Sequence, residues 1–339
     1  MSETNERWGI VLAGGEGNRV RGFLSALCGG RGIKQFCSIL GGRSLLQLTL
    51  DRVQRLIPRE RILIIVDKNH REAREQLAEW PQANIIYQPA NRETAPGILL
   101  PLSYVSHRCP QATVAVFPSD HFIADESVFI RQVAKALDET DILPRSAVLL
   151  GVTPDRMEEG YGWISSWKDG RGKDSQVVTG FWEKPTPLHA ERLMREGALW
   201  NTFVFVARAT TLWELTRLTV PELYGAFTGL RIMLGTPRAQ PFIEQLYGRL
   251  PSVNFSSQIL TPSVSRLRVL PVPEIGWSDW GSADRILETA MRMGRLEELA
   301  AKLHQGRIDD PTIMTLMSRY RNDFTPVRAY ESGTAAVLQ

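Results

Sequence analysis

A glycine-rich segment near the start of the chain has the residue types of a phosphate-binding loop. The segment 14–19, Gly-Gly-Glu-Gly-Asn-Arg, directly follows the apolar run 8–12, which is typical of a buried parallel strand. Glycines there let backbone N–H groups close around phosphate oxygens, because no Cβ blocks the approach. A second cluster at 29–32 precedes Lys34. Two glycine segments that carry Arg19 and Lys34 favour a polyphosphate ligand over a monophosphate.

The spacing of these glycines excludes two common nucleotide-binding motifs. A dinucleotide fingerprint needs a third glycine at position 20, which is Val20, and a Walker A loop needs Gly-Lys-Ser/Thr, which is missing. The alternative interpretation is that the glycines form an ordinary strand-to-helix turn and bind no ligand. Two glycine clusters on one connection argue against that alternative.

The first 150 residues alternate between strand and helix patterns, which predicts an α/β fold. After Ser44 apolar residues recur on one helical face, and a second buried-strand pattern follows at 62–66. Such alternation implies right-handed crossovers and a Rossmann-like, mostly parallel sheet with helices on both faces. Further strands are predicted at 84–87, 112–117 and 147–150, and helices at 94–107 and 127–140.

The second half of the chain has a different order of predicted strands and helices. Strands are predicted at 161–167, 176–182 and 199–207, and helices at 212–218, 221–234 and 242–247. Beyond Asp279 the pattern is helical at 282–303 and 311–320, without a hexapeptide β-helix repeat, and a loosely ordered tail is expected from about Thr325. The fold prediction therefore adds a helical C-terminal segment to the α/β sheet.

Composition narrows the class of protein. The chain has 339 residues, with 40 basic and 37 acidic side chains, so its formal net charge of +3 offers no field for nucleic acid or a membrane. Cys28, Cys37 and Cys109 lack metal or disulfide spacing. The polar N-terminus does not resemble a signal peptide, and no apolar run approaches the roughly 20 residues of a membrane helix. We expect a cytoplasmic enzyme that binds small molecules; whether it forms a homo-oligomer is open.

Eight short motifs follow one another in register between about residues 8 and 285. They are Leu-Ala-Gly-Gly-x-Gly-x-Arg at 12–19, Lys-Gln-Phe at 34–36, Arg-Glu-Thr-Ala-Pro at 92–96, Phe-Pro-Ser-Asp-His-Phe-Ile at 117–123, and the segments 160–164, 181–185, 200–201 and 276–282. In this order they resemble the nucleotide-diphospho-sugar pyrophosphorylases, most closely the bacterial mannose-1-phosphate guanylyltransferases. The resemblance implies the nucleotide-diphospho-sugar transferase fold.

The resemblance also implies a reaction. A sugar-1-phosphate oxygen attacks the α-phosphorus of a nucleoside triphosphate in line, and pyrophosphate leaves. The attacking phosphate is ionised near pH 7, so positioning and charge neutralisation supply the rate instead of a general base. The most specific expectation is GDP-mannose from GTP and mannose-1-phosphate. The alternatives are another hexose or heptose-1-phosphate or nucleotide, or a non-catalytic regulatory paralogue that binds nucleotide-sugars.

The family motifs assign roles to particular residues. By resemblance, Asp120 and Asp279 hold Mg²⁺, since two carboxylates with substrate phosphates and waters form a normal shell for this ion. Asp120 also follows a predicted strand, at the edge where open α/β sheets bind ligands. The expected catalytic residues are Arg19, Lys34, Asp120, Lys184 and Asp279. The nucleotide is assigned to Leu12, Ala13, Gly14, Gly15, Gly17, Glu93, Thr94 and Ala95, and the sugar to Gly162, Glu183 and Asn201.

The same motifs suggest a division of the chain. A catalytic domain is expected at 1–285, with a nucleotide-binding half at 1–150 and a sugar-binding half at 151–285, followed by a helical extension at 286–339. His121 is expected to order the turn around Asp120 rather than to act as a base. The chain departs from the family pattern at the prolines missing around Arg19 and Lys34, at Glu93 and at Phe203, where asparagine and glycine are usual.

Overall fold

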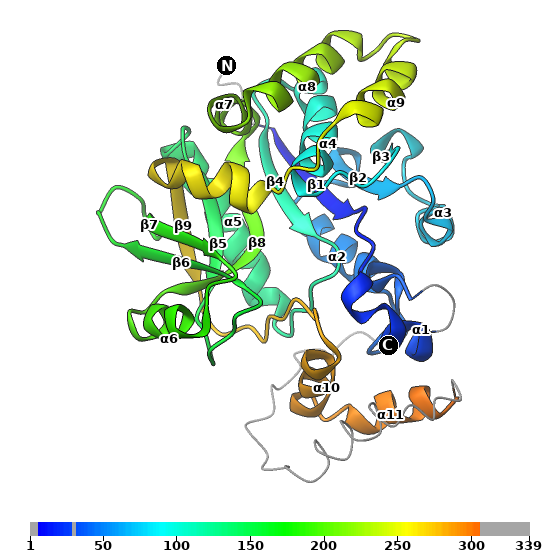
Figure 1. Ribbon diagram of the computed structural model, residues 1–339, viewed down its shortest axis with the longest axis vertical. Helices are drawn as coiled ribbons and strands as arrows, with labels where there is room; N and C mark the ends of the chain where they lie inside the picture. The colour runs from blue at the N-terminus through cyan, green and yellow to red at the C-terminus, as the bar shows by residue number, and fades with distance from the viewer. Residues whose placement is uncertain (1–5, 29–31, 306–339) are drawn as a thin grey trace, which may run out of the picture. The chain divides into compact units, whose positions relative to one another are not determined.

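The computed structural model describes residues 6–28 and 32–305, and Figure 1 shows its helices and strands. The chain divides into two compact units. The first, here called the sheet unit, comprises the described residues of Met1–Gly15, Arg52–Pro118 and Val128–Glu274. The second, called the helical unit, comprises those of Glu16–Asp51, Ser119–Ser127 and Ile275–Gln339. The predicted helix at 311–320 and the predicted tail lie outside the described residues.

The strands of the described chain belong to one nine-stranded sheet in the sheet unit, in the order β3-β2-β1-β4-β8-β5-β9-β7-β6. The strands are β1 (Arg7–Ala13), β2 (Ile62–Asp67), β3 (Ile85–Gln88), β4 (Thr113–Pro118), β5 (Ala147–Val152), β6 (Gly162–Trp167), β7 (Gln176–Glu183), β8 (Leu199–Arg208) and β9 (Leu267–Val272). The α-helices of the two units are α1 (Arg21–Cys28), α2 (Leu45–Gln54), α3 (Arg71–Gln76), α4 (Thr94–Arg108), α5 (Glu126–Ile142), α6 (Pro187–Arg195), α7 (Ala209–Thr219), α8 (Pro221–Met233), α9 (Ala239–Arg249), α10 (Ala283–Arg292) and α11 (Leu296–Gln305).

The α/β class is confirmed, but the prediction of a mostly parallel sheet is correct only for part of it. β3, β2, β1 and β4 run parallel, as strands joined by helical crossovers must. β8 is antiparallel to both β4 and β5, and β6 and β7 form an antiparallel pair. The sheet is therefore mixed, because the strand-rich middle of the chain lacks the helix between successive strands that a parallel connection requires.

Helices pack on both faces of the sheet, since side chains alternate along each strand. Ile10 of β1 belongs to a large buried cluster with residues of α4, α7 and α8. Gly9 faces the other way, where an added Cβ would lie 3.3 Å from Val53 at the end of α2. β1 is thus buried on both sides, which explains its continuous apolar run.

Strand β9 was missed because its sequence contains Arg268 and Pro271, and proline usually marks an edge strand or no strand. In the structure Pro271 lies opposite Gly151 of β5, beyond the two residues of β9 that pair with β7. Its missing N–H therefore breaks no ladder bond to β7. The Arg268 guanidinium is satisfied by the Asp169 carboxylate at 2.7 and 3.0 Å, so its charge is tolerated inside the sheet unit.

The helical unit has its own apolar core, formed by α1, α10, α11 and the segment before α2. The predicted helix 282–303 is divided into α10 and α11 at Gly294, whose φ of 66° is the left-handed conformation that commonly ends a helix. Ser282 accepts a hydrogen bond from the Arg285 N–H and so caps α10. Among the described residues, no helix is long and apolar enough to cross a bilayer.

Candidate functional site

The buried ammonium of Lys34 joins the two predicted metal residues within the helical unit. Lys34 is 4% exposed and lies in a short 3₁₀ turn, Lys34–Phe36. Its Nζ donates to Asp120 Oδ2 at 2.9 Å and to the backbone carbonyl of Asp279. A lysine so deeply buried is stabilised only when its charge is compensated. Three residues that were predicted from separate motifs therefore meet at one point.

The Asp279 carboxylate is held by donors of its own. Its Oδ1 accepts from Arg285 Nη1 at 2.6 Å and from the Gly281 N–H at 2.8 Å. The Arg19 guanidinium lies 3.8 Å from Oδ2, and 65% of its side chain is exposed. The carboxylate is thus fixed on one oxygen, while the cation near the other oxygen can reach solvent or a bound anion.

A short antiparallel bridge explains how two distant segments present their aspartates together. The Phe122 N–H donates to the Ser278 carbonyl at 2.9 Å, and the Ser278 N–H donates back at 3.1 Å. Beside this bridge the rings of Phe122 and Trp280 stack with their centroids 4.7 Å apart. The bridge lies two residues after Asp120 on one segment and directly before Asp279 on the other, so it fixes the register of the two segments.

Both carboxyl groups are held in the ionised form. Burial would raise the pKa of Asp120, but the charges of Lys34 and His121 and the hydrogen bond from Lys34 lower it below its ordinary value. Burial acts on Asp279 in the same direction, and Arg285 followed by Lys34 lowers its pKa overall. The helical unit therefore carries two carboxylates that stay charged at neutral pH.

Backbone conformations in the left-handed region accompany this cluster. Gly17 has φ 62°, and a Cβ added to it would lie 3.1 Å from Lys34 Cβ, so the end of the glycine loop packs directly on the lysine. Trp280 has φ 44° although it is a bulky residue with 1% exposure. Such strain persists only where surrounding contacts enforce it, and it is common at functional sites.

The three predicted sugar residues meet in the sheet unit. Gly162 of β6 is paired with Glu183 of β7, and the neighbouring pair Trp163–Trp200 aligns β6 with β8. A Cβ at Gly162 would lie 3.0 Å from Glu183 Oε2 and 3.3 Å from Asn201 Cβ. The glycine thus lets a carboxylate and an amide side chain lie close together.

Lys184 directly follows this group and is also strained. Its φ is 51°, and its N–H donates to the Tyr161 carbonyl at 3.2 Å. Phe203, where the resemblance led us to expect glycine, has φ 59°. The position has a backbone conformation that glycine adopts without cost, which agrees with that expectation.

The predicted nucleotide residues form two groups in the sheet unit. Leu12 and Ala13 end β1, and Gly14 follows against Gln88, whose Nε2 would lie 2.5 Å from an added Cβ. At Gly15 an added Cβ would meet no described atom within 4 Å beyond its chain neighbours. A side chain at Gly14 would therefore displace the Gln88 amide, whereas at Gly15 the described chain leaves space beside the loop.

The second nucleotide group, Glu93, Thr94 and Ala95, begins α4 and is held by the segment 253–255. Thr94 Oγ1 accepts from the Phe255 N–H at 2.8 Å, and the Ala95 N–H donates to the Val253 carbonyl at 2.9 Å. Glu93 has φ 68° and ψ −173°, a region used almost only by glycine. The backbone at Glu93 is thus constrained, and this fixes the position from which its side chain extends.

A family model described as nucleotidyl transferase matches residues 8–295 of the chain. The chain belongs to the nucleotidyl transferase family. The family prediction made from the eight motifs is confirmed. The roles of the individual residues stay predictions, although the geometry brings Lys34, Asp120 and Asp279 together in one unit, and Gly162 with Glu183 and Asn201 in the other.

Named relatives of this nucleotidyl transferase support the family from sequence and from structure. The chain is 29% identical over 303 residues to mannose-1-phosphate guanylyltransferase 2 of Escherichia coli O157:H7, with 84% of this chain and 60% of that protein covered. It is 29% identical over 294 residues to xanthan biosynthesis protein XanB of Xanthomonas campestris pv. campestris strain B100, with the same coverage. The chain thus spans about 60% of the length of these relatives. A solved structure from Thermus thermophilus, described as a mannose-1-phosphate geranyltransferase, matches with a TM-score of 0.72 and 26% identity, covering 84% of this chain and 79% of that one.

The donor set of this family member fits a magnesium ion. Within the described part of the chain, no group of three or more His, Cys, Asp or Glu side chains is placed to hold a metal. Mg²⁺ does not need such a group, because it is usually held by one or two carboxylates together with substrate phosphates and water. Asp120 and Asp279 are ionised, and their side chains are 35% and 13% exposed. They provide oxygen ligands that solvent can reach.

The sequence analysis missed two residues that support the candidate site. Arg285 is the third residue after the Ser282 cap, and side chains on the first turn of a helix point back toward its N-terminus, here toward Asp279. An arginine three residues beyond a predicted cap was therefore a usable signal. Gln88, which supports Gly14, had none, because the parallel pairing that places it beside the loop depends on β2 and β1. His121 Nε2 lies 3.7 Å from Asp120 Oδ1, consistent with its expected role in the turn.

Replacing the lysine tests the electrostatic account of the cluster. In Lys34→Met we expect the pKa values of Asp120 and Asp279 to rise, because both lose a nearby positive charge. Carboxyls with lowered pKa stabilise the fold above their unfolded value of 3.8 and lose that contribution as the pH falls through the folded value. Acid unfolding of the variant should thus begin at a higher pH. Carboxyl-carbon NMR titration measures the shift.

A matched control is Lys68→Met, which removes an exposed lysine paired with Glu244 in the sheet unit. It should leave both aspartate pKa values unchanged. Equal pKa values for Asp120 in the wild type and in Lys34→Met would contradict the account.

Proposed function

We propose that the chain is a magnesium-dependent sugar-1-phosphate nucleotidyltransferase that forms GDP-mannose and pyrophosphate from GTP and mannose-1-phosphate. The observation that carries the proposal is that buried Lys34 binds the Asp120 carboxylate and the Asp279 backbone carbonyl, and so holds the segments of two ionised aspartates together in a member of the nucleotidyl transferase family. The guanylyltransferase relatives favour this choice of substrates. A cytoplasmic location, expected from the sparse cysteines, is part of the proposal.

The transfer step needs charge compensation more than proton transfer. The attacking oxygen belongs to a sugar phosphate that is already anionic at neutral pH, so the protein must overcome repulsion between two polyanions. Arg19 is exposed enough for its guanidinium to meet the triphosphate, and Lys34 keeps the carboxylates in register. Asp120 and Asp279 would hold Mg²⁺, which supplies charge neutralisation to the phosphates when bound.

The nucleotide half of the proposal rests on the loop after β1 and on the start of α4. Gly15 leaves room for a phosphate to approach the backbone, since a Cβ there meets nothing else in the described chain within 4 Å. Glu93 would accept hydrogen bonds from guanine N1–H and N2–H₂ together. Uracil and thymine each offer one such donor, so a carboxylate at this position favours guanine.

The sugar half rests on the group at the ends of β6 and β7. Glu183 would accept from sugar hydroxyls, and Asn201 can both donate and accept. Gly162 gives these side chains their spacing, and Lys184 would bind the sugar phosphate as a point charge. The strained backbone at Lys184 fits a residue whose direction is fixed for a ligand.

A substrate panel tests the proposal. The full chain is assayed with GTP, ATP, UTP or dTTP against mannose-1-phosphate, glucose-1-phosphate and a heptose-1-phosphate, with pyrophosphate release and product mass as readouts. We expect the highest kcat/KM for GTP with mannose-1-phosphate, and no release without a divalent cation. Faster turnover of another pair would keep the chemistry but replace the substrates. Tight GDP-mannose binding with no turnover of any pair would indicate a regulatory paralogue instead.

The Gly162→Ala variant tests the sugar site separately. The added methyl group would press on Glu183 Oε2 at 3.0 Å and on Asn201 Cβ at 3.3 Å, so the carboxylate must move by a few tenths of an ångström. We expect KM for the sugar phosphate to rise about tenfold, equivalent to roughly 1.4 kcal/mol, with KM for GTP nearly unchanged.

The control for this variant is Gly225→Ala on α8, where an added Cβ meets nothing within 4 Å in the described structure. It should leave both KM values unchanged. A larger effect of Gly162→Ala on GTP than on the sugar phosphate would refute the sugar assignment.

A further inference from the structure

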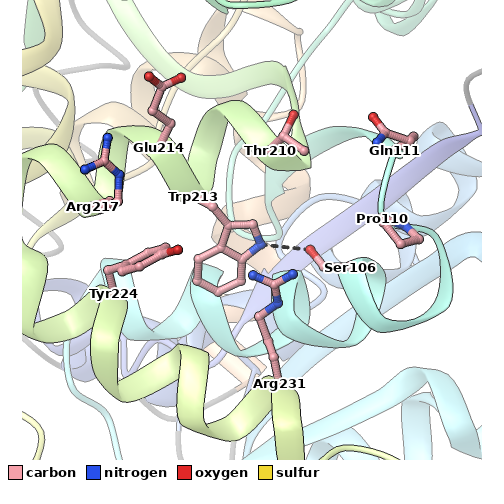
Figure 2. A pocket seen from close by; sticks show the side chains of 9 residues that line it. All are labelled: Ser106, Pro110, Gln111, Thr210, Trp213, Glu214, Arg217, Tyr224 and Arg231. Atoms are coloured by element: carbon pink, nitrogen blue, oxygen red, sulfur yellow. Dashed lines mark hydrogen bonds between the residues drawn. The ribbon is translucent and has the colours of Figure 1, made fainter.

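A separate pocket of about 250 Å³ lies in the sheet unit, between the end of α4 and helices α7 and α8 (Figure 2). Pro110 and Gln111, which line it, precede β4, and Thr210 follows β8. The pocket is therefore at the amino end of β4. β1 runs parallel to β4, and its glycine loop follows the opposite, carboxyl end. The remaining lining residues are Ser106, Trp213, Glu214, Arg217, Tyr224 and Arg231.

An oriented aromatic wall forms one side of this pocket. The Trp213 indole N–H donates to Ser106 Oγ at 2.8 Å, and the residue is only 5% exposed. Tyr224 lies edge-on to it with ring centroids 6.3 Å apart. Figure 2 shows the Arg231 side chain reaching toward the indole, and its guanidinium carbon is 5.1 Å from the ring centroid. The wall is ordered before any ligand arrives, because the indole N–H is already bonded.

The pocket also carries positive charge that no carboxylate of the described residues neutralises. Within residues 6–28 and 32–305, neither Arg217 nor Arg231 forms an ion pair with a carboxylate. Glu214, the acidic residue of the lining, is paired with Arg266 at 3.2 Å. Two guanidinium groups without a carboxylate partner among the described residues therefore line this cavity. The planar guanidinium group binds phosphate and carboxylate oxygens with two parallel hydrogen bonds.

The size of the cavity limits the ligand. A volume of about 250 Å³ is slightly below the range of roughly 300–1,000 Å³ for drug-sized ligands, so a nucleotide-sugar is too large. The partly exposed ring of Tyr224 suits the C–H face of a pyranose, and Thr210, Gln111 and Glu214 offer polar atoms to hydroxyl groups. We infer that this pocket is a second ligand site, which binds a phosphorylated monosaccharide with Arg217 and Arg231 as the charged groups available to its phosphate.

Calorimetric titration of the full chain with glucose 6-phosphate tests the inference, because this ester lacks the anomeric phosphate that the proposed reaction needs. We expect one site with a Kd below about 1 mM. The double variant R217Q/R231Q should weaken binding at least tenfold, since both charge-assisted contacts are lost. Arg249→Gln, which removes an exposed arginine on α9 outside the pocket, should leave the Kd unchanged.

A variant that keeps the charges provides an independent test. Thr210→Trp places a bulky side chain in the lining and should abolish binding by filling the cavity, and a thermal melt confirms that each variant is folded. Lys184→Ala, at the proposed sugar site, should bind as the wild type does. The inference is overturned if the wild type does not bind at 10 mM (about −2.7 kcal/mol). It is also overturned if R217Q/R231Q and Thr210→Trp bind the ester normally, or if only Lys184→Ala loses binding. Inorganic phosphate that binds as tightly as the sugar ester would overturn it as well.

Discussion

The helical unit depends on one buried positive charge. The Lys34 ammonium has little access to water, so its burial is tolerated only because Asp120 and the Asp279 carbonyl compensate it. That requirement fixes three segments of the chain at one point, with the Phe122–Ser278 bridge and the stacked ring of Trp280 beside it. The same charge lowers the pKa of both aspartates. Lys34 thus contributes both to the packing of the helical unit and to the ionisation of the candidate metal ligands, and Arg285 adds to the ionisation of Asp279.

Backbone strain is found at or beside several of the predicted site residues. Four described non-glycine residues have positive φ: Glu93, Lys184, Phe203 and Trp280. Two of them are predicted site residues, Trp280 follows Asp279, and Phe203 occupies a position where the family resemblance led us to expect glycine. Each conformation costs of order 1–3 kcal/mol and is retained because neighbouring contacts enforce it. The sheet unit tolerates Phe203 because its ring packs near Phe255, with centroids 6.4 Å apart. The departure from the family pattern is therefore compensated by packing.

The limits of sequence analysis are visible in individual elements. Buried apolar runs located β1, β2 and β4 to within one residue at most boundaries, because burial on both faces leaves a continuous signal. β9 was missed, since the Arg268 charge is compensated by Asp169, a partner from a distant loop that the sequence pattern does not reveal. The motifs selected Asp120 and Asp279, but the bridge that brings their segments together is a long-range pairing with no local signature. Arg285 could have been found from the cap of α10, whereas Gln88 depends on strand order.

The most direct test of the account is the magnesium dependence of pyrophosphate release in the wild type, Asp120→Asn and Asp279→Asn. If the Asp120 and Asp279 carboxylates hold the ion, the wild type is inactive without Mg²⁺. Each variant then loses at least about a hundredfold in kcat, and GTP binding measured by titration largely survives. Asp279→Asn that turns over at the wild-type rate would contradict the central claim that this cluster is the metal site.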